Sequence, residues 1–215
     1  MFRELFRTVV FGLAVLAAGC TMHVNRNIRV PDGTRSGSDQ MTINGNIDVG
    51  DHCELRGSCR TVNGEIRIGR ESHVRGLQTV NGGILIGAAS GVHGNVESVN
   101  GPVSCESGVK VAGRIRTVNG GMDLVGTVVQ KGLDTYNGSI SLSDSSVVKG
   151  DVVVRKSKGS GHARRGLSIR VLDGSVIEGD IRVLDPDLSV DVFLHSGGKV
   201  KGHIINARTA DSGTK

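Results

Sequence analysis

One segment of this sequence concentrates cationic side chains that could bind an anion. Residues 155–165 contain five Lys or Arg, one His and no acidic residue. The five cations are Arg155, Lys156, Lys158, Arg164 and Arg165. A basic loop of this kind can contact anionic lipid head groups, lipopolysaccharide or another anionic polymer. The alternative is a solvated loop without a partner, and the sequence leaves both interpretations open.

The acidic residues do not form a catalytic pattern. Glu65, Glu97, Asp123 and Asp134 are scattered, and the only acidic concentration lies within residues 173–191, where an Asp-Pro-Asp segment is typical of a turn. Polysaccharide-cleaving β-helices need grouped carboxylates in a groove. No nucleophile elbow, phosphate loop or dinucleotide fingerprint occurs. We therefore predict no enzymatic activity and no cofactor.

The histidines and cysteines do not predict a metal site. His52, His73 and His93 occupy different positions relative to the surrounding sequence pattern, so they are expected on the surface without a shared ligand. Five residues separate Cys53 from Cys59, which is not a typical zinc spacing.

These two cysteines and Cys105 fall at inward or small-residue positions of the pattern, so we expect buried thiols. A Cys53–Cys59 disulfide stays open, because sequence does not give its geometry.

The N-terminus has the features of an export signal. Arg3 and Arg7 precede an apolar run over residues 8–18, which is too short to span a bilayer. The run ends in Leu-Ala-Ala-Gly-Cys at residues 16–20. These residues resemble the lipobox of bacterial lipoproteins, although Leu16 stands four places before the Cys rather than the usual three.

The resemblance implies a signal peptide over residues 1–19 and lipid attachment at Cys20. Thr21, rather than the Asp that retains such proteins at the inner membrane, implies the outer membrane, facing the periplasm. Residues 20–40 are polar and contain a Pro-Asp-Gly turn signal, so we interpret them as a tether. Export, together with few aromatics, argues against nucleic-acid binding.

A repeat dominates the rest of the chain. Asn-Gly recurs at intervals of 19, 18, 19, 19 and 18 residues, at Asn44, Asn63, Asn81, Asn100, Asn119 and Asn137. Thr or Ser stands two places before each Asn, and Ile, Val or Met stands three places after it. Self-similarity at this period indicates stacked structural repeats. Stacked Asn side chains can hydrogen-bond along the stack as a ladder.

The repeat predicts an all-β protein, a single-stranded parallel β-helix of about eight coils of 18–19 residues, right-handed in preference to left-handed. Alternating apolar residues make strands with one buried face, and Asn-Gly makes tight bends. We place the β-helix domain at 41–204, with an insertion near 155–170 and a C-terminal tail at 205–215. Gly is abundant (33 residues) and aromatics are 2 %, so thin layers of Val, Ile and Leu must form the core.

Two resemblances concern this domain. Segments such as 92–96 and 146–152 resemble bactofilins, bacterial scaffold proteins that form polymers. The Thr-Val-Asn-Gly signature also resembles adhesin-like repeat proteins. Bactofilins are typically cytoplasmic and lack a lipobox, so this chain departs from that family.

Three functions stay open. The first is a lipid-anchored envelope structural or assembly protein, whose partners are the membrane and, through the open ends of the helix, further copies of itself. The second is an adhesin-like or anionic-polymer-binding module. The least favoured is a polysaccharide-active enzyme. The net charge of +5 favours anionic surfaces only weakly.

Overall fold

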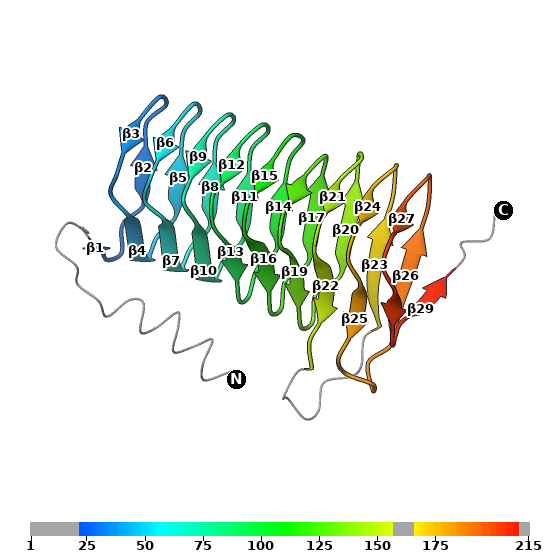
Figure 1. Cartoon of the computed structure of the whole chain (residues 1–215). Helices are drawn as coiled ribbons and strands as arrows, with labels where there is room; N and C mark the ends of the chain where they lie inside the picture. Colours follow the sequence, from blue (N-terminus) through cyan, green and yellow to red (C-terminus); the bar gives the residue numbers. More distant parts are fainter. Residues whose placement is uncertain (1–21, 157–165, 211–215) are drawn as a thin grey trace.

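The computed structural model describes residues 22–156 and 166–210, and these residues form a parallel β-solenoid (Figure 1). Three sheets run along its length, and every strand pairs in parallel with the equivalent strand of the next coil. Within the described ranges there is no α-helix, and hence none with the length and apolar character to cross a bilayer. The predicted all-β parallel β-helix is confirmed.

Sheet A contains ten strands. They are β1 (Met22–His23), β4 (Gln40–Asn44), β7 (Cys59–Asn63), β10 (Leu77–Asn81), β13 (Val96–Ser98), β16 (Arg114–Thr117), β19 (Gly132–Thr135), β22 (Asp151–Val154), β25 (Ile181–Val183) and β28 (Ile204–Ile205).

Sheet B also contains ten strands. They are β2 (Ile28–Val30), β5 (Ile47–Val49), β8 (Ile66–Ile68), β11 (Ile84–Ile86), β14 (Val103–Cys105), β17 (Met122–Val125), β20 (Ile140–Ser143), β23 (Leu167–Val171), β26 (Val190–Leu194) and β29 (Arg208–Ala210).

Sheet C contains nine short strands. They are β3 (Arg35–Ser36), β6 (Glu54–Leu55), β9 (His73–Val74), β12 (Gly91–Val92), β15 (Lys110–Val111), β18 (Val128–Val129), β21 (Val147–Val148), β24 (Val176–Ile177) and β27 (Lys199–Val200). The chain passes through sheets A, B and C in turn, so each coil contributes one strand to each sheet, except that the last described coil, β28 and β29, contributes only to sheets A and B.

The core is a set of aliphatic columns enclosed by the three sheets. In sheet B, Ile47, Ile66 and Ile84 occupy successive coils in register, and each is almost completely buried. Sheets A and C supply equivalent columns of Val, Leu and Ile. Because a single coil has too little apolar surface to stabilise itself, the columns bind each coil to its neighbours.

The corner between sheets A and B explains the Thr-x-Asn-Gly repeat. Thr61 Oγ1 donates a hydrogen bond to the Gly45 carbonyl of the preceding coil at 2.9 Å, and Thr79 does the same to Gly64 at 3.0 Å. A Cβ on Gly82 would lie 2.5 Å from the carbonyl carbon of Gly64 and would overlap its oxygen. Gly is therefore required because successive backbones touch there.

The asparagines form a hydrogen-bonded ladder on the outside of this corner. Each Nδ2 donates to Oδ1 of the preceding coil at 2.6–2.8 Å. The ladder runs through Asn44, Asn63, Asn81, Asn100, Asn119 and Asn137 and begins one coil earlier, at Asn25. Arg26 follows Asn25, so the first member lacks the Asn-Gly signature.

The solenoid begins earlier and ends later than predicted. Residues 22–40, interpreted as a tether, contain β1, β2 and β3, and Ile28 and Val30 continue the columns of Ile47 and Val49. The domain boundary at 41 is therefore wrong, and the described coils number about nine rather than eight. At the other end, β29 pairs with β26, so residues 205–210 belong to the solenoid rather than to a tail.

Candidate anion-binding surface

The Asn ladder stops where the coils become irregular. After Asn137, the next two coils lack the Asn-Gly bend, and residues 155–166 and 184–189 connect β22 to β23 and β25 to β26. Lys156 and Asp185, one from each connection, form an ion pair at 3.6 Å. The two irregular segments that the sequence singled out therefore meet at one corner.

The predicted basic residues divide between two situations. Arg155 and Lys156 directly follow the carboxyl end of β22, an inner strand of sheet A. Lys158, Arg164 and Arg165 lie outside the described residues, as does Cys20. Arg155 is not a free surface cation, because its guanidinium turns onto the outer face of sheet A and contacts Asp134.

Asp134 is the centre of an arginine cluster on sheet A. Its side chain is only 1 % exposed, although it points outward from β19, because three guanidiniums cover it. Arg114 Nη1 donates to Oδ2 at 2.8 Å, Arg116 Nη2 donates to Oδ2 at 3.1 Å, and Arg155 Nη2 donates to Oδ1 at 3.1 Å. We call these four residues the arginine cluster.

Strand register assembles the cluster from three successive coils. Arg116 in β16 is paired with Asp134 in β19, while Arg114 is paired with Gly132. Because Gly132 has no side chain, Arg114 can cross this strand toward the carboxylate. Arg155 follows the last residue of β22, whose Val154 is paired with Thr135. The site thus depends on residues 18 to 21 positions apart in the sequence.

A second group of charged side chains lies further along the same sheet. Asp151 and Asp180 both pair with Arg182. The backbone N–H of His203 donates to Asp180 at 2.9 Å, and this bond is the main reason why the pKa of Asp180 lies below its ordinary value. In this second group, acidic and basic side chains alternate, so the group carries little excess charge.

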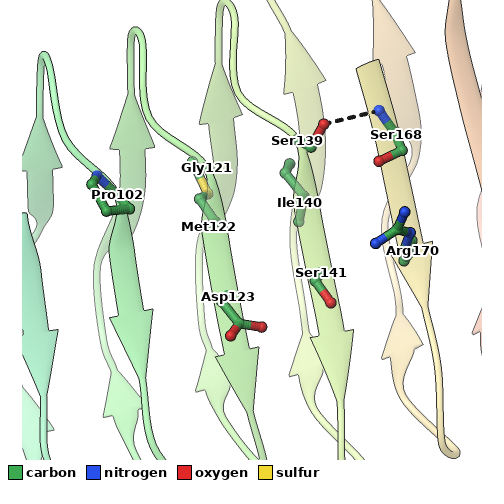
Figure 2. Close-up of a pocket in the computed structure, with 9 residues that line it drawn as sticks. All are labelled: Pro102, Gly121, Met122, Asp123, Ser139, Ile140, Ser141, Ser168 and Arg170. Carbon is green, nitrogen blue, oxygen red and sulfur yellow. Dashed lines mark hydrogen bonds between the residues drawn. The ribbon is translucent and has the colours of Figure 1, made fainter. Parts of the chain in front are cut away.

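The other surface features are shallow. A depression of about 170 Å³ lies on the outer face of sheet B. Within it, Ser141 lies between Asp123 and Arg170 on successive strands (Figure 2). The Ser168 backbone N–H donates to Ser139 Oγ at 3.1 Å at its rim. Small side chains cause this depression, and its single carboxylate does not form the acid–base pair that glycoside hydrolysis uses.

Histidines come closer together than expected. The rings of His73 and His93 lie 6.0 Å apart, because Gly91 leaves space above His73. No group of three or more potential metal ligands occurs in the parts of the chain that the structure describes.

Cys53, Cys59 and Cys105 are free thiols, and their predicted burial is confirmed. Cys53 and Cys59 do not form the disulfide that the sequence left open. Burial is the main cause that raises the pKa of Cys59 and of Cys105 to about 12, with smaller contributions from Asp39 and Asp123 respectively.

We expect these thiols to resist alkylation in the native protein. The reactive form is the thiolate, which is negligibly populated near neutral pH when the pKa is about 12. Maleimide labelling followed by mass spectrometry should show no modification of Cys59 or Cys105 until denaturant is added. Rapid labelling without denaturant would show that the coils open locally.

Comparisons of the chain with protein-family models, with curated proteins and with solved structures give no match. The strand pairing alone identifies the chain as a parallel β-solenoid. Its arginine cluster joins three guanidiniums to one buried carboxylate.

Proposed function

We propose that this protein is a lipid-anchored component of the bacterial cell envelope that presents a rigid rod and acts structurally rather than as an enzyme. The observation that carries the proposal is the position of the first strand. β1 begins at Met22, two residues after the predicted lipidation site at Cys20. A chain attached there would lead almost directly from the membrane into the first coil, without a long flexible linker.

Stiffness is what the fold offers. Each coil is paired to its neighbours in three sheets, and the aliphatic columns run without interruption from Ile28 to Val192. The nine spacings of about 4.8 Å between the ten strands of sheet A give a rod on the order of 45 Å long. Such a rod could hold its far end at a fixed distance from the membrane to which it is anchored. We propose the outer membrane, facing the periplasm.

We propose a rod that does not polymerise head to tail. Stacking the first described coil on the last in register would pair β2 with β29 in sheet B and place Arg29 diagonally next to Arg208. Like charges on neighbouring strands destabilise pairing. Inside the rod the corresponding neighbours attract, as Arg208 does Asp191.

A second candidate function is binding of an anionic envelope polymer. The arginine cluster and Lys156 favour it, because they gather cationic side chains at one place, and Arg155 and Lys156 directly precede the other predicted basic residues in the sequence. This function is compatible with the first, since a rod can also display a binding surface.

The anchor is tested by metabolic labelling with an alkyne-tagged palmitate in a bacterial host. The full chain should incorporate the label and fractionate with membranes, and Cys20→Ser should lose both properties. Cys53→Ser is the matched control, because Ser72 and Ser90 occupy the same column at the two following coils. Equal labelling of the wild type and Cys20→Ser would contradict the anchor.

Light scattering on the detergent-extracted mature chain tests the second part of the proposal. A monomer at all concentrations is expected. Filaments that grow with concentration would contradict a non-polymerising rod and would support the scaffold resemblance.

A further inference from the structure

The arginine cluster carries an excess of positive charge. Three guanidiniums share one carboxylate, which leaves a formal charge of +2 at one place on sheet A. Arg114 Nη1 and Arg116 Nη2 both contact the same oxygen, Oδ2 of Asp134, so the two cations are held close together. A single arginine would suffice to satisfy this carboxylate in bidentate geometry.

Neighbouring acids do not remove the excess. Glu97 is the register partner of Arg116 on the other side, but its carboxylate accepts from Gln78 Nε2 at 3.2 Å and makes no ion pair with Arg116. Asp151, the register partner of Gly132, pairs with Arg182. Val153, the register partner of Asp134, is uncharged.

The guanidiniums still present donors to solvent. The side chains of Arg114, Arg116 and Arg155 are 40, 26 and 28 % exposed. The Nε atoms of Arg116 and Arg155 are buried without a hydrogen-bond partner. The second Nη atom of each arginine has no partner among the described residues and is not among the buried unpartnered atoms. These Nη groups are therefore the accessible edge of the cluster.

We propose that the arginine cluster binds a phosphate group, specifically a phosphate monoester or inorganic phosphate. Guanidinium forks match the geometry of phosphate oxygens. A phosphate monoester carries a charge of about −1.5 to −2 at neutral pH, which nearly neutralises the +2 of the cluster. A carboxylate or phosphodiester, with one charge, would leave half of the excess.

Asp134 is a positioning residue in this site. Its buried carboxylate draws three long side chains from three coils to one point and orders them before a ligand arrives. The inference deepens the second proposed function, anionic-polymer binding, by naming the group that would be recognised. It does not depend on the lipid anchor.

Titration of the mature full chain in neutral detergent with inorganic phosphate, followed by ³¹P NMR line broadening, tests the proposal. Arg114→Gln and Arg116→Gln should each weaken phosphate binding about tenfold or more, since each removes a charged hydrogen-bond donor. Acetate should bind more weakly than phosphate. Arg67→Gln is the control, because it removes the same charge on sheet B, where Arg67 already pairs with Glu65 and Asp48.

A second arm distinguishes the source of the phosphate. Micelles that contain a short-chain phosphatidic acid offer the same monoester as a lipid head group. Broadening in this arm alone, lost in Arg114→Gln, identifies a membrane lipid, whereas broadening with inorganic phosphate identifies a soluble group. The proposal is overturned if phosphate binding is undetectable at millimolar concentration in both arms. It is also overturned if the wild type and both cluster variants bind phosphate equally. If an anionic polymer nevertheless binds equally to wild type and cluster variants, polymer binding stands and the cluster is not its site.

Discussion

Replacing Gly82 with alanine is expected to destabilise the solenoid by about 4 kcal/mol or more, whereas the same change at Gly83 should cost less than about 1 kcal/mol. A Cβ at Gly82 would lie 2.5 Å from the Gly64 carbonyl carbon, which belongs to the backbone of the preceding coil. No side-chain rotation can relieve this overlap. At Gly83 the nearest atom, the Pro102 carbonyl oxygen, would be 3.4 Å away, which is an ordinary contact.

The overlap at Gly82 acts on the pairing of two coils. Gly64 N–H donates to the Asn81 carbonyl at 3.2 Å, and Ile66 N–H donates to the Gly83 carbonyl at 3.0 Å, so both bonds flank the position. Separating the coils to admit a methyl group would stretch them together. Urea unfolding followed by far-UV circular dichroism measures the global loss, and amide hydrogen exchange locates it. A similar loss of stability in the two variants would show that backbone contact is not the reason why Gly recurs at the Asn-Gly bend.

The contrast between these glycines shows which parts of the fold a sequence can reveal. A constraint that every coil imposes, such as backbone contact at the Asn-Gly bend, recurs at a fixed interval and is visible as a repeat. The buried columns and the Asn ladder belong to this class. The first described coil escaped prediction because Arg26 replaces the Gly after Asn25, so the Asn-Gly signature is missing there.

The arginine cluster belongs to the other class. The sequence places Asp134 among several scattered acids and Arg155 in a basic segment that either binds an anion or is solvated. Their contact depends on outward positions that the core does not constrain, so nothing in the period marks them. The available signal was register: aligning the Asn-Gly motifs places Asp134 beside Arg116, with Arg114 two residues earlier. Arg155 could not be placed that way, because the insertion begins at this point.

Replacing Asp134 with asparagine should destabilise the protein by about 3 kcal/mol, at the lower end of what removal of one partner from a buried ion pair costs. The asparagine keeps the size of the side chain but removes the only negative charge among the described residues that pairs with Arg114, Arg116 and Arg155. Its amide also offers donors where three donors already converge. Because the arginines are partly exposed, they can turn toward solvent, and this keeps the cost below that of a fully buried cluster.

Repulsion among the three guanidiniums predicts two further properties of the Asp134→Asn variant. Added salt should restore part of the lost stability, since it screens partly exposed charges. Combining Asp134→Asn with Arg116→Gln should cost less than the sum of the single changes, because it removes one of the cations left uncompensated. Glu54→Gln is the control: its pair with Arg35 is exposed, and its loss should change the free energy of unfolding by less than about 1 kcal/mol. If Asp134→Asn behaves like this control in urea titrations, the carboxylate does not hold the arginines together, and the cluster would have to be kept in place by sheet packing alone.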